Sequence, residues 1–133
     1  MVEDFGRGAT IHSVPGTGLA EMVEDGLAGT ERARQAVRGA LGAQIAAGAD
    51  TVVLGCTHYH FLADDIRTEF PQVSIIDTSE AVARRAVQLL DELGLRAEGD
   101  DGELDLIVSG DHGAFRDAMG RLGFHSTTKE AVT

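Results

Sequence analysis

The sequence predicts an α/β fold in which a parallel sheet is flanked by helices. Short apolar segments with β-branched residues, at 51–55 and 73–76, alternate with segments whose apolar residues recur at helical spacing. Strands and helices that alternate along a chain form parallel sheets. The 133 residues allow one domain with a real core, and 43% hydrophobic with 25% charged residues is typical of a globular protein.

The first half of the chain predicts two helices before the first strand. Residues 1–16 are rich in glycine and indicate a loop or a short strand, and residues 17–27 predict a short amphipathic helix. Thr30 is a favourable N-cap residue, so a second helix is expected over 31–48. The apolar, β-branched run at 51–55 predicts a strand buried on both faces.

The second half continues the alternation. A helix is expected over 61–70, where Pro71 stops it, and a second buried strand over 73–76. Residues 79–93 predict a helix with an inward apolar face, made of Val82, Ala86, Leu89, Leu90 and Leu93. A polar loop over 96–103 leads to a third strand at 104–108. Asp111 caps a last helix, whose apolar face holds Phe115, Ala118, Met119 and Leu122.

The acidic composition excludes several kinds of partner. The formal net charge is −11, from 22 acidic and 11 basic residues, and such a field repels nucleic acid and anionic membrane surfaces. No apolar run approaches the ~20 residues that a membrane span requires. A single cysteine forms no internal disulfide, so we expect a reducing, cytoplasmic location.

Reactive side chains follow the first predicted strand. Chemistry in parallel α/β sheets lies beyond the carboxyl ends of the strands, where Gly55 permits a sharp turn before Cys56. Backbone amides at the start of the next helix favour an anion and lower the pKa of a thiol. Thr57 offers a hydroxyl to a bound carboxylate, and His58 can exchange a proton with the thiol or a substrate.

Other interpretations of these residues stay open. A lone cysteine is commonly a small buried apolar residue without chemistry. Cys56, His58 and His60 could also approach a metal ion, although no fourth ligand with zinc-type spacing follows, and we expect no metal. A phosphatase loop would need an arginine soon after the cysteine. The Gly-Thr-Gly at 16–18 is too short for a nucleotide-binding loop.

The motif GCTHYHFL at 55–62 resembles the second-lobe signature of the cofactor-independent glutamate racemases, in the aspartate/glutamate racemase superfamily. Residues 21–26, 76–83 and 109–123 resemble further segments of that family, in the right order. The resemblance implies that two cysteines invert the α-carbon of glutamate without pyridoxal phosphate or another cofactor, supplying D-glutamate for peptidoglycan. Inversion needs a proton-transferring group on each face of the carbon.

The resemblance also assigns roles to individual residues. Cys56 is expected to be one of the two thiols, with His58 assisting its proton transfer. Thr57 and Gly55 are expected to bind the substrate. Glu24 matches a family acid that supports this half of the site, although a solvated glutamate on an acidic helix is the alternative.

The sequence differs from the family because it lacks the motifs of the first lobe. The first-lobe cysteine, Asp-Ser motif and Asn-Thr motif are not among these residues. We therefore expect residues 1–94 to be the second-lobe α/β unit, and 95–133 to be a C-terminal strand-helix segment that packs on the first lobe in the family. The expected partners are glutamate and either a first-lobe chain or a second copy. His60 also replaces a proline that often follows the tyrosine, which we expect to be tolerated.

Two further functions remain as alternatives. The chain could be a catalytically silent module that binds a small carboxylate or a protein. It could also belong to an enzyme that acts on aspartate, hydantoins or maleate with the same thiol geometry. The Thr57-His58 pair favours glutamate over the hydantoin and maleate branches, and we expect the isolated chain to racemise glutamate poorly or not at all.

Overall fold

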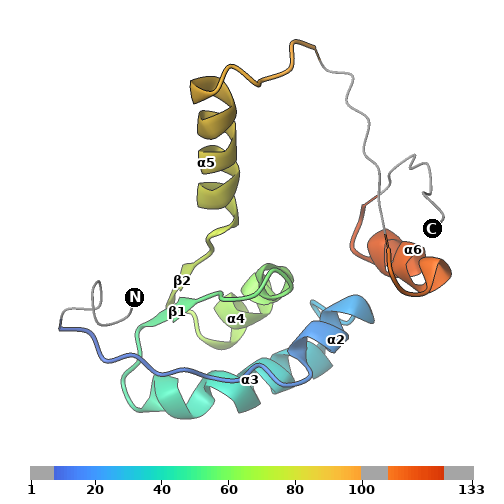
Figure 1. Ribbon diagram of the computed structural model, residues 1–133. Coiled ribbons are helices and arrows are strands. Elements are labelled where there is room, and N and C mark those ends of the chain that lie inside the picture. The colour runs from blue at the N-terminus through green and yellow to red at the C-terminus, as the bar shows by residue number, and fades with distance from the viewer. Residues whose placement is uncertain (1–7, 100–107, 125–133) are drawn as a thin grey trace.

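The computed structural model describes residues 8–99 and 108–124. The elements in chain order are α2 (Leu19–Glu24), α3 (Glu31–Ala46), β1 (Thr51–Val53), the 3-10 helix η1 (Tyr59–Leu62), α4 (Ala63–Glu69), β2 (Ser74–Ile76), α5 (Ser79–Glu92) and α6 (His112–Arg121), as Figure 1 shows. None of the helices in these two ranges combines the length and apolar character that crossing a membrane requires.

The two described strands pair in parallel, as the alternating pattern predicts. Val52 of β1 lies opposite Ile75 of β2, and both side chains pack against the helical core. The neighbouring pair, Val53 and Ile76, points to the other face and is 61% and 49% exposed. The prediction that residues 51–55 are buried on both faces is therefore wrong in the described structure, because helices cover only one face of this sheet.

The core joins α2, α3, η1, α4 and the residue after β1. Its most deeply buried large side chains are Val23 from α2, Val37 from α3 and Leu62 from η1. The remaining members of the cluster are Leu19, Ala33, Leu54, Ala63 and Ile66. Removal of this apolar surface from water stabilises the arrangement of these elements.

The predicted helices are present with shifted bounds. The helix expected over 17–27 is the shorter α2, and the helix expected over 61–70 divides into η1 and α4. Thr30 caps α3 as predicted, since its Oγ1 accepts a hydrogen bond from the Ala33 amide at 3.3 Å. These local signals succeed because capping depends on residues close in sequence.

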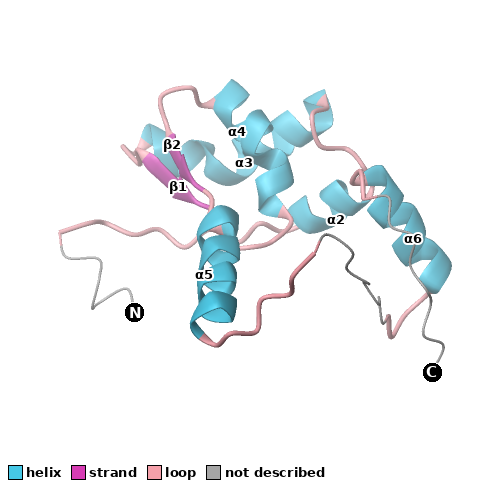
Figure 2. Cartoon of the chain, turned by 90° about the horizontal axis from the view of Figure 1, so that it is seen from above, coloured by secondary structure: helices cyan, strands magenta, loops and turns pink. Residues whose placement is uncertain are grey.

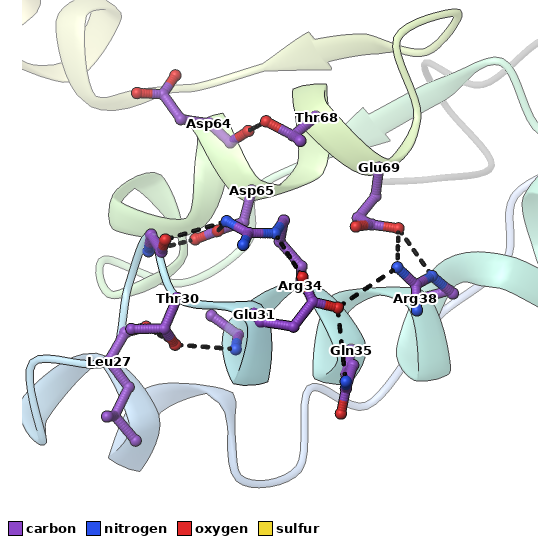
Figure 3. A network of polar contacts seen from close by, with 12 residues as sticks. Leu27, Thr30, Glu31, Arg34, Gln35, Arg38, Asp64, Asp65, Thr68 and Glu69 are labelled. Atoms are coloured by element: carbon purple, nitrogen blue, oxygen red, sulfur yellow. Dashed lines mark hydrogen bonds and ion pairs between the residues drawn. The ribbon is translucent and has the colours of Figure 1, made fainter.

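The turn that connects α2 with α3 is attached to α4 by a group of polar contacts, here called the polar clamp (Figure 3). The buried carboxylate of Asp65, 2% exposed, accepts a hydrogen bond from the Gly29 amide at 2.8 Å. Arg34 donates to the Gly29 carbonyl at 3.0 Å, and its Nη1 lies 3.8 Å from Asp65 Oδ1. Arg38 pairs with Glu69 of α4 at 2.7 Å. The clamp thereby holds the segment that follows α2 in place.

Helix α5 extends from the end of β2 and stands apart from the other helices in Figures 1 and 2. The helix has no buried residue, so the prediction that its apolar face points inward is wrong for the described chain. That face keeps large apolar side chains in solvent, with Val82 66%, Leu90 42% and Leu93 67% exposed. The periodicity identified the apolar face, but no described element covers it.

Helix α6 begins at the predicted cap, because Asp111 Oδ1 accepts a hydrogen bond from the Ala114 amide at 2.7 Å. Its C-terminal end lies beside α2 (Figure 2), and Leu122, just after it, packs against the core. The third strand was predicted at 104–108. Residues 104–107 lie outside the described residues, and Val108 belongs to no described strand.

Candidate active site

Three predicted site residues form one line of contacts at the carboxyl end of β1. The Sγ of Cys56 lies 3.7 Å from Nδ1 of His58. The opposite ring nitrogen, Nε2 of His58, lies 3.0 Å from Oε1 of Glu24 at the end of α2. The structure thus brings together residues that are 34 positions apart in sequence, in the order thiol, imidazole and carboxylate.

The turn that carries Cys56 is fixed from both ends. Leu54, buried at 6% exposure, anchors the chain after β1, and the Cys56 carbonyl accepts a hydrogen bond from the Tyr59 amide at 3.1 Å. The hydroxyl of Tyr59 donates to the Gly16 carbonyl at 3.3 Å. A Cβ at Gly16 would overlap the Tyr59 ring, so this close approach requires glycine.

The electrostatics of the turn favour a thiolate. The backbone amide of His58, followed by its side chain, lowers the pKa of the Cys56 thiol below its ordinary value, although burial opposes this. The hydrogen bond to Cys56 raises the pKa of His58, and the Glu24 carboxylate adds to that effect against the opposing effect of burial. Both shifts favour the same charged pair, a Cys56 thiolate beside a His58 imidazolium.

The line of contacts is open to solvent at its carboxylate end. The side chain of Glu24 is 53% exposed, and that of His58 is 31% exposed. Cys56 is a free cysteine, and it is neither fully buried nor fully exposed. A partly exposed thiol with a lowered pKa beside a histidine has the properties of a reactive cysteine.

The two predicted substrate-binding residues flank the thiol. Gly55 and Thr57 are both exposed, one on each side of Cys56. Their roles stay predictions. Both residues are exposed to solvent on either side of the partly buried Cys56.

His60 has a different environment from His58. Its ring centroid lies 3.9 Å from that of Phe61, and among the described residues its Nδ1 has no hydrogen-bond partner. In the described ranges, no group of three or more His, Cys, Asp or Glu side chains could hold a metal ion. The interpretation in which Cys56, His58 and His60 converge on a metal has no support from these residues.

Sequence reasoning missed the residues that support the site from outside the motif. Asp65 clamps the turn after α2, and Arg121 of α6 donates to the carbonyl oxygen of Glu24 at 2.8 Å. Asp65 gave a weak signal, an acidic residue beside the apolar pair Ala63 and Ile66 on one helix. Arg121 gave none, because its partner lies 97 positions away.

The fold and the thiol site define the class of this protein. Residues 5–86 match the family model for Asp/Glu/hydantoin racemases, and the chain belongs to this family. The resemblance drawn from the motif GCTHYHFL is therefore confirmed, as is the prediction of a parallel α/β fold that is part of the family's architecture.

Individual relatives show how much of the family's length is present. The chain is 38% identical to glutamate racemase of Pseudomonas putida over 117 residues, which are 87% of this chain and 44% of that protein. It is 40% identical to glutamate racemase of Deinococcus radiodurans over 106 residues, 78% of this chain and 37% of that protein.

A solved structure shows the same relation in three dimensions. Glutamate racemase from Thermus thermophilus, in complex with β-chloro-D-alanine, superimposes with a TM-score of 0.80 at 26% identity. The match covers 96% of this chain and 50% of that chain. The chain thus spans about half the length of the racemases that it matches.

Proposed function

We propose that this chain supplies one half of a two-base amino-acid racemase site, with glutamate as substrate and Cys56 as the acid and base on one face of the α-carbon. The observation that carries the proposal is the line of contacts from Cys56 through His58 to Glu24, at 3.7 and 3.0 Å. The product would be D-glutamate, made in the cytoplasm for peptidoglycan. No cofactor enters the proposal.

The proposed reaction balances with two protein groups. The thiolate of Cys56 removes the α-proton, and the electron pair of the broken C–H bond stays on carbon, delocalised into the carboxylate. A second acid on the opposite face delivers a proton to that carbon. His58 stabilises the thiolate as an imidazolium, and Glu24 orients His58 and stabilises its positive charge. Thr57 and the Gly55 turn bind the substrate carboxylate.

The second acid has to come from outside these residues if it is a thiol. The sequence holds one cysteine. The sources that we propose are a first-lobe polypeptide or Cys56 of a second copy. In this proposal residues 1–94 form the second-lobe unit, and residues 95–133 form the segment that contacts the first lobe.

Helix α5 is the surface that we propose for contact with that other half. Its apolar face leaves Val82, Leu89, Leu90 and Leu93 in solvent. A contiguous apolar face of this kind is typical of an interface. The match covers only half of the Thermus thermophilus chain, so that racemase contains a further half that this chain lacks.

Isotope exchange distinguishes removal of the α-hydrogen from inversion of the α-carbon. We expect the isolated protein, in heavy water with L-glutamate, to exchange the α-hydrogen for deuterium slowly, while the optical rotation of glutamate changes little. Exchange needs one base, whereas inversion needs a group on each face. The α-proton signal in NMR and the circular dichroism of glutamate measure the two events on the same sample.

Two variants make this experiment decisive. Cys56→Ser is expected to lose exchange, while Arg67→Met, an exposed side chain paired with Asp64 on α4, should leave it unchanged. Exchange that survives in Cys56→Ser would contradict the proposal. Rapid inversion by the isolated wild type would show that the chain holds a complete site.

A binding module is the second candidate, favoured by the single thiol and by the open face of α5. A folded sample that binds glutamate in calorimetry, yet exchanges no α-hydrogen, would support this function over catalysis. An enzyme for aspartate is the other alternative, since the matched family includes aspartate in its description. The same exchange measurement with L-aspartate distinguishes it.

A further inference from the structure

Helix α6 and the residues just after it contact α2, which ends at Glu24, and η1, which begins one residue after His58. Arg121, the last residue of α6, donates its Nε–H to the carbonyl oxygen of Glu24 at 2.8 Å. The aliphatic part of the same side chain packs on Gly26, with Cδ 3.2 Å from where a Cβ there would be. Phe124 makes an edge contact with Phe61 of η1, at 6.4 Å between ring centroids.

The Arg121 contacts lie at the C-terminal end of α2. Glu24 is the last residue of α2, and its carbonyl is one of those that a helix leaves without an intrahelical partner. A guanidinium at this position satisfies that carbonyl and is favourable beside the negative end of the helix. The backbone of Glu24 is therefore held from α6, while its side chain reaches His58.

We propose that Arg121 is a positioning residue, which holds the end of α2 so that the Glu24 carboxylate stays against His58 and Cys56. This inference rests on the proposed function for its purpose, although the contacts themselves do not depend on it. The charged and titratable groups that meet here are Cys56 and His58 from the turn after β1, Glu24 from α2 and Arg121 from α6. Asp25 follows Glu24 at the end of the same helix.

Loss of the Arg121 contact would change the reactivity of the Cys56 thiol as well as the position of α2. If the end of α2 shifts, His58 loses the carboxylate that supports its positive charge, and the Cys56 thiolate then loses support from the imidazolium. The fraction of thiolate at neutral pH falls, and the thiol reacts more slowly with an alkylating agent.

The pH profile of Cys56 alkylation by iodoacetamide tests this inference without requiring catalysis. We expect Arg121→Met to slow alkylation at neutral pH by about two- to fivefold and to move the profile to higher pH. This range is what loss of the exposed His58–Glu24 ion pair would produce. Arg121→Lys retains a cationic donor and should recover part of the rate. The matched control Arg67→Met should follow the wild-type profile.

A Glu24→Gln variant separates failure of this inference from failure of the proposed function. If Glu24→Gln moves the profile but the folded Arg121→Met does not, Arg121 has no positioning role and the inference is overturned. If neither Glu24→Gln nor His58→Asn moves the profile, the proposed thiolate–imidazolium pair itself is wrong. If both Arg121 variants unfold in circular dichroism, Arg121 is a structural residue, which also contradicts the inference.

Discussion

The body of the molecule and helix α5 use the same kind of amphipathic sequence with opposite outcomes. In α3 and α4 the apolar residues are covered, and Val37 and Ile66 are 1% and 4% exposed. In α5 the apolar face is as regular, yet every residue of the helix is exposed. Periodicity therefore determines which face of a helix is apolar, whereas burial depends on whether another element is there to cover it.

Identical substitutions in the two regions give the largest expected contrast. Leu62→Ala removes a side chain that is 1% exposed and leaves a cavity, so it should lower the free energy of unfolding by about 2–5 kcal/mol. Leu93→Ala, at 67% exposure, should change it by less than about 0.5 kcal/mol. Urea unfolding followed by circular dichroism measures both. Equal effects would show that α5 packs against the body in solution.

Two adjacent acids on α4, Asp64 and Asp65, have opposite environments and should differ in their effect on stability. Asp65→Ala leaves the Gly29 amide without its carboxylate partner and should cost about 1–3 kcal/mol of stability. Asp64→Ala is the matched control, because that side chain is 93% exposed and pairs with Arg67 in an exposed i,i+3 contact. Its effect should stay below about 0.5 kcal/mol. Thermal unfolding of both variants tests the clamp, and equal midpoints would contradict it.

The smallest effect on stability is expected on the apolar face of α5. A Leu90→Glu and Leu93→Glu double variant should leave the unfolding midpoint nearly unchanged, because both side chains are already in solvent. The same variant should bind less of a hydrophobic fluorescent dye than the wild type, since it divides an exposed apolar face. A large fall in the midpoint, with unchanged dye binding, would mean that this face is already covered.

The sequence predicted what short-range patterns determine. Thr30 and Asp111 were recognised as helix caps, and the parallel pairing of β1 with β2 followed from the alternation of elements. The position of Cys56 after a strand predicted a reactive site, and the family resemblance added Glu24. Contact between Glu24 and His58 then required the fold to bring α2 to the turn after β1.

The remaining features depend on contacts between distant segments, which no local pattern encodes. Arg121 is an ordinary helix-terminal arginine in sequence, and only the packing of α6 places it on Glu24. The buried acid Asp65 resembles its exposed neighbour Asp64 until α3 packs against α4. Burial of Val53 was predicted wrongly for the same reason, since the described chain provides no layer over that face of the sheet.

The pH dependence of folding carries two opposing contributions from the site. The pKa of Cys56 is lowered in the folded protein, so its contribution is present above the unfolded pKa and is lost as pH falls through the folded value. The pKa of His58 is raised, so its contribution is present below the unfolded pKa and is lost as pH rises through the folded value. A direct titration of the thiol is therefore more informative than stability against pH.

The state of the Cys56 thiol can be measured directly by the ultraviolet absorbance of its thiolate, followed against pH in the folded wild type and in His58→Asn. We predict that the wild-type thiol titrates below the pH of an unperturbed cysteine, and that the variant titrates at a higher pH than the wild type. If the folded wild type titrates like a free cysteine, and His58→Asn titrates at the same pH, the claim that His58 lowers the pKa of the Cys56 thiol is contradicted.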